Sequence, residues 1–268
     1  MADVPILTCD TATKLEERHR DAVVVCGSHG AVYPAYLAAK AGLRAVLLND
    51  AGGGLHGAGI RCLDYCQPLG MACATVAHTS GRIGEADDMR VRGLISRVNA
   101  VAAGLGIEAG APVGEALDKL RNAPVWHGEP PPYREGRQVV LAEPGKPRVI
   151  CIDSASMVEP ADAGQIVITG SHGGLVAGRP DLTLQVDALV ALFNDAGIGI
   201  DEAGVARLPL LDRRGIAAAT VAAMTARIGD GLSTYQDGVL SRVNDAARRL
   251  GARPHMRAQD FVAALIDR

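Results

Sequence analysis

The sequence predicts an α/β protein made of two tandem internal repeats, each an open parallel βαβ-type sheet with helices on both faces. Three observations lead there: the chain repeats itself, short apolar runs alternate with helical stretches of roughly 10 to 20 residues, and large core residues are scarce. Of 268 residues, 48% are apolar but only 3% are aromatic. A core of Ala, Val, Leu and Ile suits helices packed closely on a parallel sheet.

The repeat appears when the sequence is aligned with itself. At a shift of 145 residues, 26 of the 60 positions in 47–106 are identical to their counterparts in 192–251. At a shift of 143, Gly-Ser-His-Gly at 27–30 coincides with the same four residues at 170–173. A match this dense indicates duplication, and it decides the architecture before any single element is assigned.

Each copy has the same order of elements. A short apolar run ends in Asp-Thr-Ala or Asp-Ser-Ala, a second runs into Ser-His-Gly and a helical stretch, and a third ends in Asn-Asp-Ala-Gly. Another helical stretch, a fourth run, a loop with Arg-Ile-Gly and a longer helix with Ser-Arg-Val-Asn follow. Apolar strands alternating with helices imply right-handed crossovers and a sheet covered on both faces.

The two copies, residues 1–120 and 147–268, are therefore expected to be related by a pseudo-twofold axis, and residues 121–146 belong to neither. This segment is rich in proline at its start, where neither a helix nor a central strand can continue, and it ends in a predicted hairpin around Glu-Pro-Gly-Lys. We interpret it as a linker. The alternative is a lid over a site, formed by Trp126, His127 and Tyr133.

Composition limits the possible partners. With 27 basic and 30 acidic residues the net charge is −3, without long blocks of one sign, so we expect no nucleic-acid or membrane partner. No apolar window reaches membrane-spanning length, and the charged N-terminus does not resemble a signal or transit peptide. Six irregularly spaced cysteines favour reduced thiols and a cytoplasmic protein. Its internal symmetry and Ala/Gly-rich helices would also suit a homo-oligomer.

The polar residues that both copies retain follow directly on apolar runs. Because ligands of open α/β sheets bind beyond the carboxyl ends of the strands, we expect these residues on one edge of the molecule. They are Asp10 and Asp153, Ser28 and Ser171, His29 and His172, Asn49 and Asn194, Asp50 and Asp195, and Arg82 and Arg227. Their retention indicates a constraint that is either structural or chemical.

The Gly-Ser-His-Gly motif is the main catalytic candidate. Its histidine can act as base or acid, oriented by the carboxylate of Asp10 or Asp153, while Ser28 or Ser171 binds substrate. Its glycines and the following helix start offer backbone N–H groups to an anion. The alternative is structural: the serine caps the helix and the histidine bonds to a neighbouring loop.

The Asn-Asp and Arg-Ile-Gly motifs are candidates for substrate binding. The amide and carboxylate could hydrogen-bond a polar substrate or hold a divalent ion, or they could only shape a turn. Arg82 and Arg227 suit a carboxylate or imide oxygen. Pairing with Asp50 or Asp195 as a structural ion pair is the alternative.

The copies also differ. His78 corresponds to Ala223, whereas Ser80 corresponds to Thr225 and keeps its hydroxyl. If only one site works, the first copy is favoured, with His78 and Ser80 as additional catalytic candidates. The cysteines form no recognisable zinc set, and neither a Walker A nor a G-x-G-x-x-G motif is present, so we expect no metal and no cofactor.

These motifs predict an enzyme that acts on a small polar or anionic metabolite in a cleft between the copies. The first hypothesis is a hydrolase of a C–N bond in an amide or imide. Its base would be His29 or His172, its nucleophile Ser80 or another loop hydroxyl, and its oxyanion site the motif amides with an arginine. A lyase or isomerase acting beside a carbonyl would need the same base but no nucleophile. A non-catalytic metabolite-binding or assembly subunit is the third hypothesis.

Overall fold

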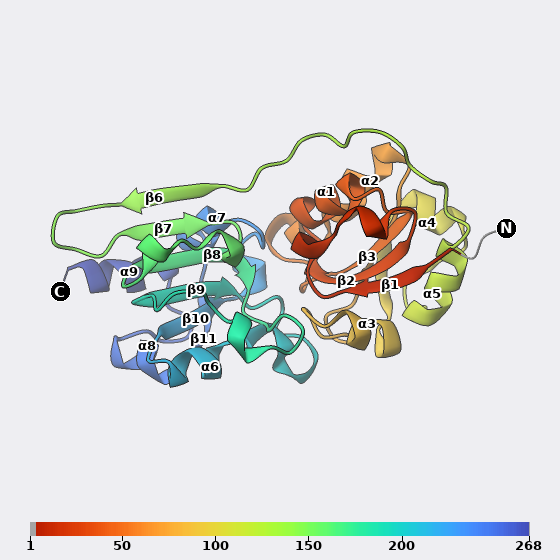
Figure 1. Cartoon of the computed structure of the whole chain (residues 1–268). Helices are drawn as coiled ribbons and strands as arrows, with labels where there is room; N and C mark the ends of the chain where they lie inside the picture. Colours follow the sequence, from red (N-terminus) through yellow and green to blue (C-terminus); the bar gives the residue numbers. More distant parts are fainter. Residues whose placement is uncertain (1–3, 268) are drawn as a thin grey trace.

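A computed structural model describes residues 4–267 and confirms the α/β class. Two sheets form, one in each half of the chain, and they lie side by side (Figure 1). The first sheet has the strand order β1-β2-β3-β4-β5 and the second has the order β11-β10-β9-β8-β7-β6. The two orders are equivalent except for β6, which adds an edge strand to the second sheet.

The first unit has a mixed sheet in which β5 alone runs antiparallel to its neighbour. Its strands are β1 (Ile6–Cys9), β2 (Val23–His29), β3 (Ala45–Asn49), β4 (Ala72–Val76) and β5 (Ile95–Val98). Its helices are α1 (Val32–Lys40), α2 (Cys62–Cys66), α3 (Ala86–Arg92), α4 (Ala100–Gly104) and α5 (Val113–Leu120).

The second unit has β7 to β10 parallel, with β6 and β11 antiparallel at the two edges. Its strands are β6 (Arg137–Leu141), β7 (Val149–Ile152), β8 (Ile166–His172), β9 (Val190–Asn194), β10 (Ala217–Val221) and β11 (Leu240–Val243). Its helices are α6 (Leu208–Arg213), α7 (Gly231–Gln236), α8 (Asp245–Arg249) and α9 (Ala258–Ile266).

Each sheet is buried on both faces, as continuous apolar strands require. Along β2, Val23 and Val25 pack with α3, α4 and α5, whereas Val24 and Cys26 pack with α1 and α2. In the second unit α7, α8 and α9 cover one face, and α6 covers the other together with residues 173–189. This double cover leaves the strand ends as the place where polar side chains gather.

Two local predictions are wrong. No helix follows Ser-His-Gly in the second copy, where residues 173–189 form an irregular loop with one short 3-10 turn, because Gly178 and Pro180 interrupt any helix. The Ser-Arg-Val-Asn motif does not lie in a helix either. Its first three residues belong to β5 and β11, and its asparagine caps the next helix in both copies.

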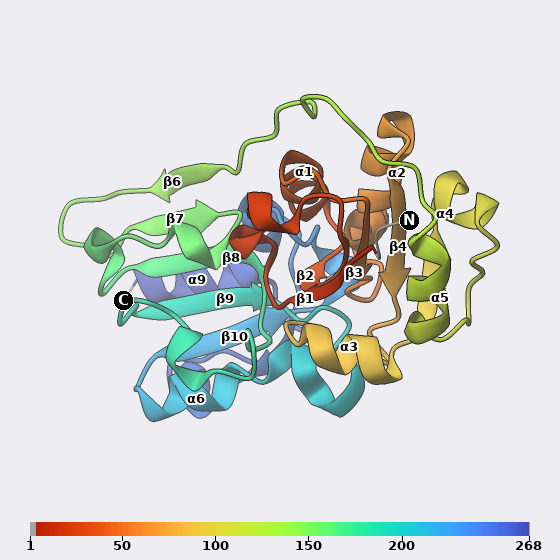
Figure 2. The same cartoon turned by 45° about the vertical axis from the view of Figure 1, so that its right-hand side comes forward.

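The segment between the units crosses from the first unit to β6 along the top of both views (Figures 1 and 2). It is anchored on the first unit, where the Tyr65 hydroxyl donates a 2.7 Å hydrogen bond to the carbonyl oxygen of Pro131. Trp126 packs against the core of that unit. Strand β6 then pairs with β7 as a hairpin.

The contact between the units joins equivalent positions of the repeat. A buried apolar cluster consists of three such pairs, Ala51 and Ala196, Ala58 and Ala203, and Ile83 and Ile228. Gly52 meets its own counterpart, since a Cβ on Gly52 would lie 2.8 Å from the Cα of Gly197. These contacts are what a pseudo-twofold axis would produce, and they place the carboxyl ends of both sheets toward each other.

All six cysteines are free thiols. Among the helices described, none is long and apolar enough to cross a membrane.

Candidate functional site

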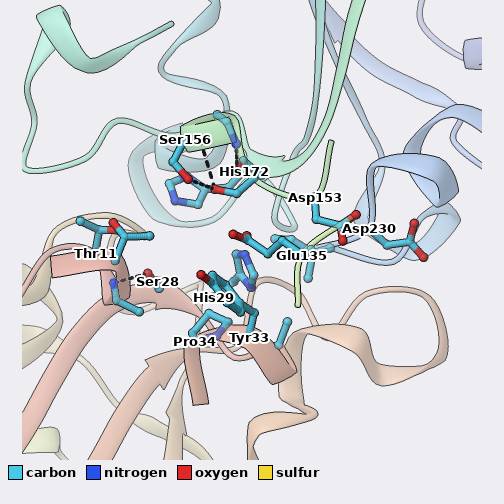
Figure 3. A pocket seen from close by; sticks show the side chains of 18 of the residues that line it. Thr11, Ser28, His29, Tyr33, Pro34, Glu135, Asp153, Ser156, His172 and Asp230 are labelled. Atoms are coloured by element: carbon cyan, nitrogen blue, oxygen red, sulfur yellow. Dashed lines mark hydrogen bonds between the residues drawn. The ribbon is translucent and has the colours of Figure 1, made fainter. Parts of the chain in front are cut away.

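A cavity of about 470 Å³ lies where the carboxyl ends of the two sheets meet, and both units and the linker line it. His29 and His172, the last residues of β2 and β8, face it from the two units (Figure 3). The cavity therefore brings together the two histidines that the repeat placed at equivalent strand ends.

Each histidine rests on the Arg-Ile-Gly loop of the other unit. A Cβ on Gly229 would lie 3.4 Å from Cε1 of His29, and a Cβ on Gly84 would lie 3.5 Å from Cε1 of His172. These distances are ordinary van der Waals contacts, so the loop backbone of each unit packs against the histidine ring of the other. Both glycines have φ +83°, which is the reason for glycine at the end of the Arg-Ile-Gly motif in both copies.

Both histidines are neutral at physiological pH. Burial lowers the pKa of His29 to about 4. Burial, the charge of Arg207 and the nearby His29 hold the pKa of His172 well below its ordinary value. Neither ring therefore carries a charge at rest, and each neutral ring has one nitrogen that can accept a hydrogen bond and one that can donate.

The two rings differ in their hydrogen bonds. The backbone N–H of Gly174 donates to Nδ1 of His172 at 3.2 Å, so the neutral ring carries its proton on Nε2. In His29, Nδ1 is buried and has no hydrogen-bond partner within residues 4–267. His172 is thus fixed as a donor through Nε2, whereas the proton of His29 is not assigned by its surroundings.

Asp10 and Asp153 do not orient the histidines. Asp10 accepts a 2.8 Å hydrogen bond from the N–H of Ala86, the first residue of α3. Asp153 accepts from Gly231, the first residue of α7, and from Gly136. Each carboxylate accepts a hydrogen bond from a free N–H group at the start of a helix and opposes the positive end of its dipole. Asp153 also lines the cavity.

The two motif serines line the cavity but are engaged with backbone. Ser28 Oγ accepts a 2.9 Å bond from the N–H of Ala12, and Ser171 Oγ accepts an equal bond from Ala155. They join the first two strand-end loops of each unit and do not cap a helix. The motif's last glycine amide, at Gly30 or Gly173, donates to a backbone carbonyl and is not free for an oxyanion.

The Asn-Asp motif lies outside the cavity lining and serves the turns at the unit contact. Asn49 Oδ1 accepts from the N–H of Ala51, and Asn194 makes the same bond in the second unit. Asp50 and Asp195 accept from the glycine amide two residues on. These four residues have a structural role.

His78, Ser80 and Arg82 are also absent from the lining. His78 Nδ1 lies 2.8 Å from Asp50, and this hydrogen bond raises the pKa of His78. Ser80 donates to the carbonyl oxygen of Ala77 and accepts from Leu94. Arg82 forms an ion pair with Asp201 of the other unit. The structure therefore does not unite His78 and Ser80 with the cavity histidines.

Arg227, the counterpart of Arg82, does line the cavity. Its guanidinium is paired within its own unit, 2.9 Å from Asp230 and 3.5 Å from Asp237. The position equivalent to Asp201 is His56 in the first unit, and His56 lines the cavity too. An ion pair, Arg82 with Asp201, therefore joins the two units on one side. On the other side the equivalent residues, Arg227 and His56, line the cavity instead.

Two cavity residues were missed by the sequence analysis. Arg207 is buried in the wall beside His172, and Glu135 comes from the linker and points into the cavity (Figure 3). Burial, together with the charge of Asp153, raises the pKa of Glu135 to about 7 despite the adjacent Tyr33 hydroxyl. Tyr133, which the lid interpretation had named, lines the cavity, whereas Trp126 does not.

Within residues 4–267, no group of three or more His, Cys, Asp or Glu side chains is arranged to hold a metal ion. Comparisons with protein-family models, with curated proteins and with solved structures gave no match. The cavity must therefore be interpreted from its own chemistry.

Proposed function

We propose that this protein is an enzyme that acts on a small polar metabolite in the cavity between the two units, with His29 and His172 as general base and acid. The observation that carries the proposal is that two uncharged, buried imidazoles from equivalent strand ends face one cavity. A proton acceptor and a proton donor held on opposite sides of a bound molecule are what acid–base catalysis requires.

Proton transfer beside a carbonyl, the chemistry of an isomerase or lyase, is the better supported reaction. No hydroxyl or thiol of the described residues forms a hydrogen bond with either histidine, so an activated side-chain nucleophile is lacking. Ser80, the nucleophile first expected, is held by Ala77 and Leu94 outside the cavity lining.

Hydrolysis of an amide or imide C–N bond is the second candidate, with water in place of the serine. It is favoured by the hydroxyl-bearing side chains of the Asp-Thr-Ala-Thr and Asp-Ser-Ala-Ser loops, which line the cavity and could position a water molecule. They are Thr11, Thr13, Ser154 and Ser156. Six free thiols support the further proposal of a cytoplasmic location. A homo-oligomeric state is part of the proposal as well.

A single experiment separates these reactions. The purified protein is incubated in D₂O with a panel of small amides, imides, keto acids and hydroxy acids, and the products are analysed by mass spectrometry. Proton transfer beside a carbonyl exchanges carbon-bound hydrogen for deuterium, whereas hydrolysis adds water across the cleaved bond. A panel that remains unchanged favours the metabolite-binding hypothesis.

Three histidine variants test the residues. His29→Gln and His172→Gln should each reduce turnover by roughly 10²- to 10⁴-fold, because each removes a proton carrier. His78→Ala is the matched control, since that histidine pairs with Asp50 away from the cavity, and it should leave turnover nearly unchanged. Turnover that survives both glutamine substitutions would overturn the proposal.

A further inference from the structure

We propose that Arg207 is the anion subsite of the cavity and binds a carboxylate or phosphate group of the ligand beside His172. This inference names the substrate class of the proposed enzyme and rests on that site, but not on its catalysis. It depends on the surroundings of one guanidinium group, which differ from those of the other cationic side chains in the cavity wall.

Arg207 is 3% exposed, and several hydrogen-bond donors of its guanidinium group have no acceptor within residues 4–267. One guanidinium nitrogen, Nη2, donates a 2.9 Å hydrogen bond to the carbonyl oxygen of Gly174, and the group lies 4.8 Å from the centre of the Phe193 ring. Nε and Nη1 are buried without an acceptor among the described residues. Buried guanidinium groups are normally fully hydrogen-bonded, so two unmet donors indicate a missing partner.

No carboxylate of the described chain neutralises this charge. Burial lowers the pKa of Arg207 to about 10, which still leaves it protonated at physiological pH. An unpaired buried cation destabilises the folded protein unless something supplies the opposite charge. The cavity that Arg207 lines is where such a charge can enter.

The other cations of the lining do not need an anion. Arg227 is paired with Asp230 and Asp237, and Arg61 lies 3.6 Å from Asp64. Lys14 is exposed to solvent. Arg207 is therefore distinguished by burial and by the lack of a carboxylate.

The subsite belongs to the second unit alone. Arg207 corresponds to Cys62, and Phe193, over whose ring it lies, corresponds to Leu48. Cys62 and Leu48 are fully buried in the apolar core of the first unit. A ligand anchored at Arg207 is consequently held in one orientation, with its anionic group toward the second unit and the rest of the molecule toward His29.

The test uses the thermal unfolding midpoint, Tm, of the whole protein with three sodium salts at equal ionic strength: malonate, phosphate and chloride. Malonate or phosphate should raise the Tm of the wild type above its value in chloride by more than it raises the Tm of Arg207→Met, because these anions also stabilise folded proteins in general. A response to malonate alone identifies a carboxylate ligand, and a response to phosphate alone identifies a phosphorylated one. Equal Tm values in all three salts would overturn the proposal.

Arg207→Met and Arg207→Lys separate binding from folding. Arg207→Met should raise the Tm in chloride, because it removes an unpaired buried charge, and it should weaken the response to the anion at least tenfold in apparent Kd. Arg207→Lys keeps the charge and should retain part of the response. If Arg207 only supports the fold, Arg207→Met will lower the Tm and respond to the anion as the wild type does.

A second readout does not depend on any variant. Because the charge of Arg207 lowers the pKa of His172, an anion bound there should move that pKa upward, which is measurable by NMR titration of the histidine Cε1–H signals. His29→Gln should keep this response even where turnover is lost. Loss of the anion response with turnover intact would reject the subsite alone, whereas turnover without the histidines would reject the proposed catalysis alone.

Discussion

The two units differ at the equivalent position that follows the glycine-rich turn after β3 and after β9. In the first unit it holds Cys62, a small thiol packed with Cys66 and Cys73 in a dry core. In the second unit it holds Arg207, a charge in a cavity wall. Two units with equivalent strands thus differ at this position: one keeps an apolar core, while the other places a charge in the cavity wall.

A second difference concerns what covers the strand ends. In the first unit α1 follows the Ser-His-Gly motif directly and begins at the cavity wall. In the second unit residues 173–189 form an irregular loop instead, and its residues Val176, Thr183, Leu184 and Gln185 reach the cavity. The two units therefore differ more in the walls of the cavity than in the sheets beneath it.

The largest predicted effect tests how closely the units fit. Gly84 and Gly229 are equivalent and both have φ +83°, so alanine is strained at either. A Cβ on Gly84 would also collide with the carbonyl oxygen of Leu175, whereas one on Gly229 would meet only side-chain atoms at 3.4 Å. We expect Gly84→Ala to cost about 3 kcal/mol or more of unfolding free energy, and Gly229→Ala about 1 to 2 kcal/mol.

Urea denaturation followed by circular dichroism measures both glycine variants. If they are equally destabilised, the two loops contact the opposite unit alike, and the asymmetry described at Leu175 is wrong.

A smaller effect distinguishes His78 from its counterpart Ala223. The hydrogen bond to Asp50 raises the pKa of His78, so its contribution is fully present below the unfolded pKa of about 6.5 and is lost as the pH rises through the raised value. His78→Ala should therefore cost about 1 to 2 kcal/mol at pH 5.5 and less at pH 8.5. A cost that does not change with pH would mean that the pair is a neutral hydrogen bond.

The smallest effect concerns the ion pair that closes one side of the unit contact. Asp201 accepts from Arg82 and Arg92 at the surface, and exposed pairs contribute little and are screened by salt. Asparagine also tolerates the positive φ of this position. Asp201→Asn should lower the Tm detectably at low ionic strength. In about 0.5 M NaCl, where the Debye length falls to roughly 4 Å, it should have hardly any effect. A large loss that persists in high salt would show that this side holds the units together.

The sequence was sufficient for the internal repeat, for the first four strands of each copy in chain order and for the expectation that His29 and His172 follow strand ends, but it missed β5 and β11. Internal comparison and hydrophobic runs report those features directly. The packing of loops within a unit could not be predicted in this way, and that packing decides that Asp50 contacts His78 while Asp10 accepts a hydrogen bond from the start of α3. Retained polar residues were therefore assigned to chemistry when many serve turns.

Arg207 and Glu135 could not be predicted from residues that both copies share. The residue equivalent to Arg207 in the first copy is Cys62, and Glu135 lies in the linker, which occurs only once. A charge inside the apolar stretch Ala-Arg-Leu-Pro-Leu-Leu was the available signal, since such residues are seldom fully buried without a partner.

The contact between Gly52 and Gly197 has a consequence for the history of the protein. A residue that touches its own copy is the mark of a twofold axis between identical subunits, which is what an ancestral homodimer would have had before its genes fused. In such a dimer every substitution enters twice, so an arginine at the position of Arg207 would have placed two unpaired cations around one cavity. In a single chain each of two equivalent positions can differ, as Arg207 and Cys62 do.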